Sequence, residues 1–595
     1  MTTSNNVSRP EYPRPQFRRD PWINLNGPWT YAFDFGKSGM QHGFANSNGF
    51  DGVIMVPFCP ESPLSGVNYK DFIEMMWYQR TITIPAAWAG KHVILHFGAV
   101  DYESEVFIDG ESVGRHWGGT ASFSYDITAH VKPGHTHNLV VYVRDEVRSG
   151  VQPSGKQCPA LKSFGCLYTR TTGIWQTVWL EAVAECGLRD CQITPDVDNA
   201  RFIVTPRFYA LKAGLRLRAT LKAGDAVVSQ AESIAANGTP LILPVTSPKL
   251  WSPVSPFLYD LTFEVLDGDA VVDTVQSYAG LRKVHIEGHR IFLNNEPFYL
   301  RLVLDQGFYP DGIWTAPTDD ALKRDIELSL AAGFNGARLH QKVFEERFHY
   351  WADKLGYLTW GESSSWGIDV KDVVSARNFL AEWREIVTRD RNHPSIIAWT
   401  PFNETHDTGD TRQHYRLHRD AAQLTRDLDP TRPVNDASGY VHVDTDLWTV
   451  HTYQQDPALL RDQLKPHPQH GPFRNFPDRE VTYTGQPYLV DEYGGIKWIP
   501  RDDLVYADDS WGYGNAPQTL EEFYTRLEGL TDVLLSYEHI VGFCYTQLTD
   551  VEQEQNGIYN YDRTEKFDMA RIKRIFEKGK QITSNQSSVY GYQLT

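Results

Sequence analysis

The stretch Asn392–Asp407, NHPSIIAWTPFNETHD, decides the fold. The apolar run at 396–399 is short enough for one buried strand, and a proline bounds it on each side. The polar pair Asn403 and Glu404 follows just past the expected strand end. In a parallel barrel, catalytic groups stand at that position. The alternative interpretation is an ordinary polar turn after a core strand.

The expected surroundings of Glu404 suit a general acid. Trp399 and Phe402 precede it in the sequence and would partly remove water from its carboxyl group. Desolvation disfavours the charged form, so we expect a raised pKa for Glu404. A raised pKa keeps a carboxyl group protonated near neutral pH, as proton donation requires.

The region 286–595 alternates strand-like runs with amphipathic helices. One helix should begin at Thr318, which can cap it, and Gly333 should stop it. Further helices are expected through 348–351 with an end near Gly356, at about 371–391 and at about 568–580. The expected strands are 298–304, 334–340, 357–360, 396–399, 433–436, 447–453, 487–493 and 541–547. Eight such units predict a (β/α)8 TIM barrel rather than a doubly wound sheet.

Every predicted barrel strand ends in polar or charged side chains, which is typical of an active-site face. Loops begin at strand ends, so some polarity there is expected in any barrel. The strand-end residues are Asp305, Gln306, Arg338, His340, Glu362, Asn403, Glu404, Asp436, His451, Tyr453, Asp491, Glu492 and Gln547. As substrate-binding residues we expect Asn403, Arg338, His340, Tyr453, Asp305, Gln306, Glu362, His451, Trp366 and Gln547.

The first half of the chain has the alternating pattern of β domains. Six or more strands between about 22 and 183 predict a β-sandwich of jelly-roll type, assigned to 1–183. Residues 184–285 suit a second sandwich, immunoglobulin-like in size but without the Cys-Trp-Cys pattern of antibody domains. Residues 1–22 are rich in Pro and Arg, and we expect an extended arm too polar to join a core.

The composition excludes some classes of binding partner. A net charge of −18 argues against nucleic acid and anionic membranes. The 6 cysteines are scattered without a C-x-x-C pair, and the N-terminus lacks an apolar stretch, so we expect a reduced, cytoplasmic protein. No apolar run is long enough for a membrane span.

Competing catalytic motifs are weak. The sequence contains no H-E-x-x-H, P-loop, dinucleotide fingerprint or G-x-S-x-G elbow. The histidines His467 and His470 lie in a Pro-rich run that favours a surface loop over a metal site. We therefore predict neither a metal nor a cofactor.

Glu404 and Glu492 stand out by placement, after the fourth and seventh predicted strands. These strands lie on opposite sides of a barrel, so the two carboxyl groups should face each other across its mouth. A separation of about 5–5.5 Å is the arrangement for retaining glycoside hydrolysis. A nucleophilic carboxylate must stay ionised, and Arg338 and Tyr453 are candidates to stabilise it.

These motifs resemble glycoside hydrolase family 2, over nearly the whole chain. The segments that carry the resemblance are 100–110, 114–119, 172–180, 250–253, 278–282, 392–404 and 491–494. The resemblance implies an exo-acting, retaining β-glycosidase with Glu404 as acid/base and Glu492 as nucleophile. It also implies that Asn403 binds the sugar 2-hydroxyl, and that Arg338, His340 and Tyr453 line the floor of the site.

The sequence departs from well-known family members at the ends of its first and third barrel strands, at 304–312 and at 361–362. The Asn-x-Lys of β-glucuronidases after strand eight has no clean match, although Arg563 or Lys566 could replace its lysine. We therefore expect β-galactoside-like substrates first. β-Glucuronides, α-L-arabinosides and β-galactofuranosides are the alternatives.

A second class of function is a non-catalytic carbohydrate-binding protein on the same scaffold. The expected ligand in either case is a glycoside or an oligosaccharide. We expect the jelly roll to buttress the pocket rather than to bind sugar itself. The separate β domains also offer surfaces for a homo-oligomer.

Overall fold

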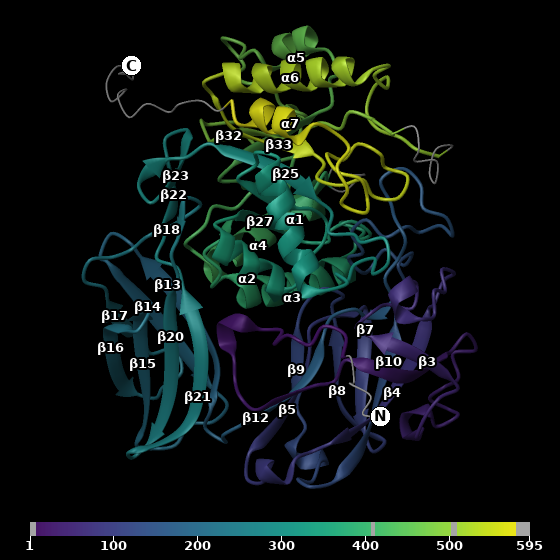
Figure 1. The fold of residues 1–595 in the computed structure, drawn as a ribbon, viewed down its shortest axis with the longest axis vertical. Helices are drawn as coiled ribbons and strands as arrows, with labels where there is room; N and C mark the ends of the chain where they lie inside the picture. Colours follow the sequence, from purple (N-terminus) through teal and green to yellow (C-terminus); the bar gives the residue numbers. More distant parts are fainter. Residues whose placement is uncertain (1–6, 406–410, 501–508, 579–595) are drawn as a thin grey trace.

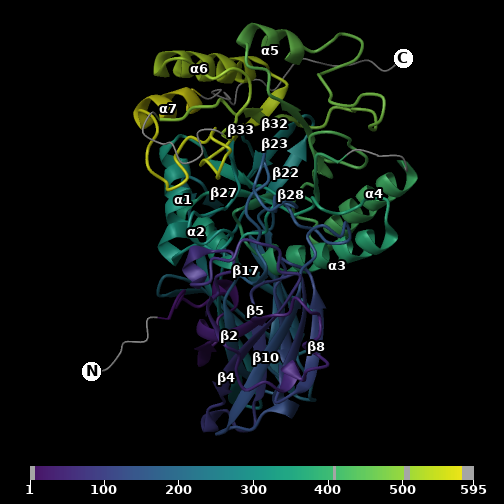
Figure 2. The same ribbon diagram turned by 90° about the vertical axis from the view of Figure 1, so that its right-hand side faces the viewer.

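The computed structural model describes residues 7–405, 411–500 and 509–578. Two β-sandwiches lie side by side, and a barrel-like domain rests on both (Figure 1). The view turned by 90° shows the same stacking of the barrel on the β domains (Figure 2). Positions 406 and 407 of the fold-deciding stretch, and 579 and 580 of the expected last helix, lie outside the described residues.

The first sandwich is antiparallel. Its sheets have the strand orders β1-β12-β5-β9 and β3-β2-β4-β10-β7-β8, and a small pair β11-β6 joins them. Buried Trp29, Tyr78 and Leu95 belong to the core between the sheets. The strands are β1 (Trp22–Asn24), β2 (Gly27–Phe33), β3 (Gly52–Val56), β4 (Met75–Thr83), β5 (His92–Phe97), β6 (Val100–Asp101), β7 (Glu103–Ile108), β8 (Glu111–Trp117), β9 (Phe123–Asp126), β10 (Thr136–Arg144), β11 (Gly173–Ile174) and β12 (Val178–Val183).

The second sandwich has sheets of order β13-β14-β17 and β16-β15-β20-β21. In β15, Leu215, Leu217 and Ala219 are buried while the residues between them are only partly buried, the period-two pattern of a one-sided strand. The strands are β13 (Leu188–Asp196), β14 (Arg201–Phe208), β15 (Leu215–Ala223), β16 (Ala226–Ile234), β17 (Leu241–Pro244), β20 (Tyr259–Asp267) and β21 (Ala270–Ala279). Two short sheets complete this region. One is the pair β18 (Trp251–Ser252) and β19 (Ser255–Pro256). The other has three strands, β22 (Val284–Glu287), β23 (Arg290–Leu293) and β24 (Glu296–Pro297), and precedes the barrel.

The barrel domain contains a parallel sheet of order β28-β27-β26-β25-β33-β32-β31. Its strands are buried along their whole length except at Arg301 in the first, as expected when helices cover a parallel sheet. They are β25 (Leu300–Asp305), β26 (Gly336–Leu339), β27 (Leu358–Glu362), β28 (Ile396–Thr400), β31 (Trp448–Thr452), β32 (Tyr488–Gly494) and β33 (Ile540–Thr546). The helices are α1 (Asp319–Ala331), α2 (Glu346–Leu355), α3 (Val373–Asp390), α4 (Thr411–Leu428), α5 (Pro457–Leu464), α6 (Leu520–Ser536) and α7 (Met569–Phe576).

The expected fifth strand at 433–436 is wrong as a regular strand. Val434 forms only an isolated bridge to Trp399, and the pairing resumes later, between β29 (Phe402–Asn403) and β30 (Ala437–Ser438). Pro433 cannot donate a ladder hydrogen bond. On the other side, Gly439 donates its backbone N–H to the Thr449 side chain at 2.9 Å, in place of a backbone partner.

The helix boundaries follow the sequence signals. The Thr318 side chain accepts from the backbone N–H of Ala321, and α1 begins at the next residue after this cap. Helix α2 ends at Gly356, whose φ of 71° is readily adopted only by glycine. These predictions needed only local sequence, and the structure confirms them.

The prediction that the N-terminal arm is too polar for a core is wrong. Tyr12 and Phe17 are buried, and Phe17 belongs to the core of the second sandwich. Arg19 is also buried and forms an ion pair at 2.9 Å with Asp273 of β21. The arm buries its polar groups because acidic partners from both sandwiches satisfy them.

A long loop of the jelly roll, residues 145–172 between β10 and β11, reaches the barrel; we call it the jelly-roll loop. Ser154 donates its backbone N–H to the Trp366 carbonyl at 2.7 Å. Further along, Thr169 donates its backbone N–H to Glu552 at 3.1 Å. The loop is therefore fixed to the barrel at two places.

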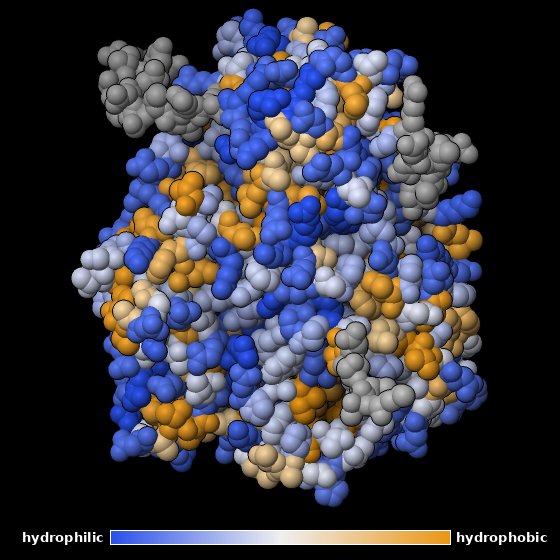
Figure 3. All heavy atoms as spheres, in the orientation of Figure 1, coloured by the Kyte–Doolittle hydropathy of each residue, from blue (hydrophilic) through white to orange (hydrophobic). Residues whose placement is uncertain are grey.

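The outer surface shown in Figure 3 has small hydrophobic groups scattered among hydrophilic residues. Some single apolar side chains are well exposed, such as Val254 at 94%. None of the described helices combines the length and the apolar character needed to cross a lipid bilayer.

Candidate active site

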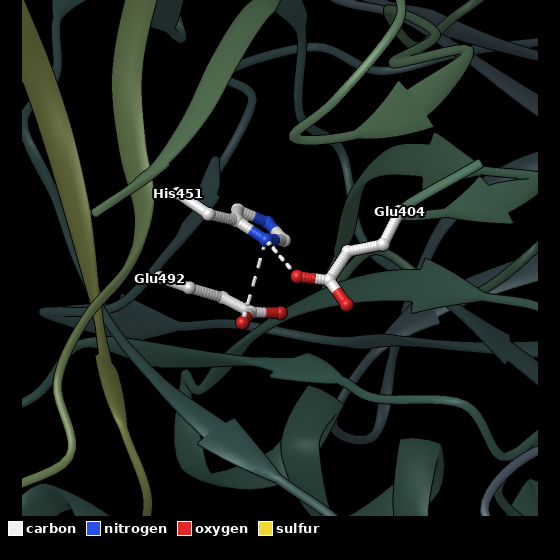
Figure 4. A group of neighbouring side chains, drawn as sticks. All are labelled: Glu404, His451 and Glu492. Atoms are coloured by element: carbon white, nitrogen blue, oxygen red, sulfur yellow. Dashed lines mark hydrogen bonds and ion pairs between the residues drawn. The ribbon is translucent and has the colours of Figure 1, made fainter. Parts of the chain in front are cut away.

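Glu404 and Glu492 meet at the C-terminal end of the barrel strands. Glu404 follows β29 and Glu492 lies within β32, and His451 from β31 stands between their carboxylates (Figure 4). His451 Nδ1 is 2.8 Å from Glu404 Oε1 and 3.4 Å from Glu492 Oε2. One ligand atom of each of the three side chains lies within 4.8 Å of the others. The two carboxylates thus face the same small space.

Glu492 is held by a cation and a hydroxyl donor. Arg338 donates from Nη2 to Glu492 Oε1, and Tyr453 donates its hydroxyl to Glu492 Oε2 at 2.5 Å. The Tyr453 ring stacks on Tyr513, with ring centroids 3.4 Å apart and the planes nearly parallel. A cation and a hydroxyl donor stabilise a carboxylate that must stay negative.

Arg338 is held in place by groups behind it. It donates to Glu362 Oε2 at 2.8 Å and to Asn403 Oδ1 at 3.1 Å. His340 Nδ1 lies 3.0 Å from the other oxygen of Glu362. Burial raises the pKa of Glu362 to about 7 and lowers the pKa of His340 well below its usual value. Glu362 and His340 therefore support Arg338 and are themselves fully buried.

The expected rise in the pKa of Glu404 is wrong for this structure. Burial does push the pKa upward, but the hydrogen bond and the positive charge of His451 outweigh it and leave the pKa of Glu404 lowered. His451 itself has its pKa raised to about 10, because the charges of Glu492 and Asp491 outweigh its desolvation. The sequence could not place His451 beside Glu404, since the two are 47 positions apart.

The backbone at Glu404 is unusual. Its φ of 49° lies in the left-handed region that residues with a side chain rarely adopt. The backbone N–H of Glu404 donates to the Ser438 carbonyl of β30 at 3.0 Å and holds this conformation. Backbone strain of this kind concentrates at functional sites.

Glu404, His451 and Glu492 also have the spacing of a candidate metal cluster. A ligating histidine must be neutral, because the metal takes the nitrogen lone pair. The raised pKa of His451 favours the imidazolium form, which donates to Glu404 and forms an ion pair with Glu492 instead. The charges of this cluster fit an ion-paired triad better than a metal centre.

Asn403 and Trp366 lie together beside Glu404. Trp366 donates from Nε1 to the Asn403 carbonyl at 3.1 Å, so its ring lies next to the pair. Asn403 Nδ2 is buried and has no hydrogen-bond partner among the described residues. It is a donor available to a ligand.

The remaining sequence-predicted residues are spread around the mouth. Asp305 and Gln306 end β25, and Gln547 directly follows β33, the neighbouring strand. Asp436 differs from them, since it accepts from His442 and from three backbone N–H groups and so supports a loop. Burial raises the pKa of Asp436, but the hydrogen bonds and the charges of His442 and His418 together outweigh it and lower the pKa to about 2.

Three residues of the jelly-roll loop reach this site and were not predicted. Lys156 is buried with Nζ 4.6 Å from the centre of the Trp366 ring, and the charges of Cys166, Glu554, Glu492 and Glu404 raise its pKa against the effect of burial. Tyr168 donates its hydroxyl to Glu554. Burial raises the pKa of Cys166, and the charges of Glu554, Glu404 and Glu492 raise it further. One signal was available: a connection this long without strands is often functional.

Two cations considered for a sugar carboxylate are already paired. Arg563 binds Asp325 at 3.0 Å, and Lys566 binds Asp550 at 2.8 Å. Both ion pairs are largely or fully buried. Neither side chain replaces the lysine that the Asn-x-Lys motif would supply.

Comparison with protein families gives three matches along the chain. Residues 23–152 match the sugar-binding domain of glycosyl hydrolases family 2, residues 187–282 match a further domain of that family, and residues 284–497 match its TIM barrel domain. The matches follow the order of the three domains described above, and the barrel match ends before α6, β33 and α7.

Individual relatives and structures agree with this assignment. The chain is 24% identical over 590 residues to a β-glucuronidase of Paenibacillus borealis, covering 91% of this chain and 94% of the relative. It is 24% identical over 512 residues to a β-galactosidase of Thermoanaerobacter pseudethanolicus, covering 83% of this chain and 65% of that relative. A β-glucuronidase structure from Ruminococcus gnavus, in complex with D-glucuronic acid, shares the fold with a TM-score of 0.78 at 22% identity, covering 96% of this chain and 100% of that one. Three consecutive domains of the chain match this family, and the fold and the strand-end carboxylates described above agree with the match. The chain belongs to glycosyl hydrolase family 2.

Proposed function

We propose that this chain is a retaining exo-β-glycosidase, with Glu492 as nucleophile and Glu404 as acid/base. The observation that carries the proposal is the carboxylate pair, whose ligand atoms lie within 4.8 Å of each other. Retaining enzymes hold their two carboxyl groups about 5–5.5 Å apart, whereas inverting enzymes leave room for a water between them.

In the first step, a Glu492 oxygen attacks the anomeric carbon while the bond to the leaving oxygen breaks. Glu404 gives that oxygen a proton, so the aglycone departs as an alcohol. In the second step, Glu404 takes a proton from water, and the hydroxide oxygen displaces Glu492 from the anomeric carbon. Two inversions give net retention of the β configuration.

His451 supplies the proton that the first step needs. In the resting site the imidazolium donates from Nδ1 to Glu404 Oε1 at 2.8 Å. Transfer of that proton along the hydrogen bond produces the acid form of Glu404. The pair therefore holds one proton in common, and the lowered pKa of Glu404 is compatible with its role.

The neighbours have matching roles. Arg338 and Tyr453 bind the two Glu492 oxygens and orient them before attack. Asn403 offers its unpartnered Nδ2 to the sugar 2-hydroxyl, a contact that strengthens in the transition state. Trp366 holds the backbone of Asn403 and forms part of the wall.

Two sugar classes compete for the site. β-Galactoside-like substrates remain the first expectation, with α-L-arabinosides and β-galactofuranosides as neutral alternatives. Several relatives are β-glucuronidases, which favours glucuronides instead. A nitrophenyl glycoside panel that includes all of these configurations separates the candidates.

The catalytic roles are tested with azide. In Glu492→Gly, azide enters the vacated space and should restore turnover with an α-glycosyl azide as product. In Glu404→Ala, azide reacts with the glycosyl-enzyme and should give the β-glycosyl azide. Folded variants that show no azide-dependent product, together with no labelling of Glu492 by a 2-deoxy-2-fluoro glycoside, would leave a non-catalytic carbohydrate-binding protein as the better assignment.

A further inference from the structure

A chain of hydrogen bonds links the jelly-roll loop to two barrel strands at the mouth; we call it the Glu554 network. Gln306 Nε2 donates to the Tyr168 hydroxyl oxygen at 3.2 Å, and Tyr168 donates its proton to Glu554 Oε2 at 2.5 Å. On the other side, Asn556 Nδ2 donates to Glu554 Oε1 at 3.0 Å, and Gln547 Nε2 donates to Asn556 Oδ1 at 2.8 Å. All five side chains are buried.

The central carboxylate determines the direction of every bond in this network. A carboxylate only accepts, so Tyr168 and Asn556 must both donate to Glu554. Since the single Tyr168 proton is used there, Gln306 must donate to Tyr168 rather than accept from it. Asn556 has its nitrogen on Glu554, so its oxygen must accept from Gln547. Each glutamine nitrogen thereby has one of its two N–H groups used within the network.

The two glutamine oxygens are left over. Gln306 Oε1 and Gln547 Oε1 are buried and have no donor among the described residues, and the same holds for Asp305 Oδ2. These atoms lie at the ends of the neighbouring strands β25 and β33, next to β32, which carries Glu492. Buried acceptors without partners are unfavourable, so this part of the site is completed by a ligand that brings O–H donors.

The charges point the same way. Burial raises the pKa of Glu554, and the charge of Glu492 raises it further, so the site already disfavours negative charge here. The charge of Lys156 opposes this rise, but Lys156 also faces the negative charges of Glu404 and Glu492. A carboxylate on the sugar would bring no donor for the free acceptors and would add a further negative charge to this group.

We propose that the Glu554 network is a specificity wall that accepts hydrogen bonds from the hydroxyl groups of a neutral sugar and disfavours a uronic acid. The inference rests on the proposed glycosidase function and names its substrate class. Glu554 acts as a specificity-determining residue, and the jelly roll contributes to the choice of sugar through Tyr168.

The first test compares kcat/KM for nitrophenyl β-D-galactopyranoside, β-D-glucopyranoside and β-D-glucuronide. We expect the better neutral substrate to exceed the glucuronide by about 100-fold or more, since sites built for hydroxyl groups reject analogues that leave buried groups unpaired. Glu554→Gln removes the charge but keeps the shape, and should narrow the ratio by about 10-fold. That 10-fold change corresponds to about 1.4 kcal/mol.

Glu552→Gln is the matched control. It removes the same charge two residues away, where the carboxylate anchors the backbone of Thr169 outside the Glu554 network. Its ratio of neutral to glucuronide turnover should equal that of the wild type. If both variants change the ratio equally, general charge rather than the network sets the preference, and the proposal is wrong.

Binding gives a readout that does not depend on turnover. Calorimetry with isofagomine and its uronic counterpart compares a neutral and an acidic ring of the same size. Tighter binding of the neutral compound supports the inference, whether or not a glycoside is cleaved. Absence of cleavage would reject only the proposed catalysis. The inference is wrong if the uronic compound binds as tightly as the neutral one or more tightly, or if neither compound binds. It is also wrong if the glucuronide is the preferred substrate, but that result leaves the glycosidase assignment intact.

Discussion

At the scale of single residues, His451 controls the ionisation of the acid/base. Its positive charge lowers the pKa of Glu404, while its own pKa is raised to about 10. Glu404 loses its acid form as pH rises, so the alkaline limb of the kcat/KM profile reports on this pair. The position of that limb is a direct measure of the contact.

His451→Asn removes the charge and leaves a hydrogen-bonding side chain of similar reach. The pKa of Glu404 should then rise, because His451 supplies the largest contributions that oppose burial. We expect a lower kcat, by about 10–100-fold as for loss of a proton-transfer group, and an alkaline limb that moves to lower pH, because Glu404 alone holds the proton less firmly than a pair in which His451 has a pKa of about 10. An alkaline limb that stays in place or moves to higher pH would contradict the shared proton.

The residue scale also shows what sequence reasoning can reach. It predicted that Glu404 and Glu492 face each other, because strand-end carboxyl groups are visible in a periodic pattern, and the structure places them close together. It gave the wrong direction for the pKa of Glu404 because that value depends on His451, which only the closure of the barrel brings near. Lys156 and Tyr168 were missed for the same reason, since their partners lie in a different domain.

At the scale of elements, local signals predicted more than long-range ones. The Thr318 cap and the Gly356 stop were correct because each depends on a few neighbouring residues. The expected strand at 433–436 failed because strand pairing depends on both neighbours. The polar arm was misjudged because its buried partners lie in two other segments.

The jelly-roll loop provides an element-scale prediction. Gly155 has a φ of 57°, and a Cβ there would meet the Gln341 carbonyl oxygen at 2.2 Å. Gly155→Ala should push the loop from the barrel, raise KM and lower the melting temperature. Enzyme kinetics and thermal unfolding measure both effects.

Gly165→Ala is the control for backbone strain. Its φ of 54° is similar, and a Cβ there would meet no atom within 4 Å. This variant should lose comparable stability from the strained backbone but keep the wild-type KM. If the two variants raise KM equally, contact of the loop with the barrel has no part in substrate binding.

At the scale of the whole molecule, the N-terminal arm connects the two sandwiches. Arg19 pairs with Asp273 of the second sandwich and lies 3.6 Å from Glu181 of the first. Arg19→Met leaves the buried carboxylate of Asp273 without its cation and removes one of the cations near Glu181. Loss of one partner from a buried ion pair typically costs about 3–5 kcal/mol, so a clear drop in the melting temperature is expected.

The neighbouring residue offers a matched comparison. Arg18 pairs with Asp20 at 3.2 Å, with both side chains more than half exposed. Exposed pairs contribute little, so Arg18→Met should unfold close to the wild-type temperature. Equal melting temperatures for the two variants would show that the buried arm does not hold the sandwiches together.

The predicted homo-oligomer is a separate question, which light scattering would answer.

The attachment of the jelly-roll loop to the barrel has a consequence for engineering. A barrel expressed alone would lack one side of its pocket, because Lys156 and Tyr168 belong to another domain. Recombining the barrel with the β-sandwich of a relative would change the ligand-facing surface without altering Glu404 or Glu492. Substrate preference in this architecture can therefore be changed by domain exchange while the reaction chemistry is inherited unchanged.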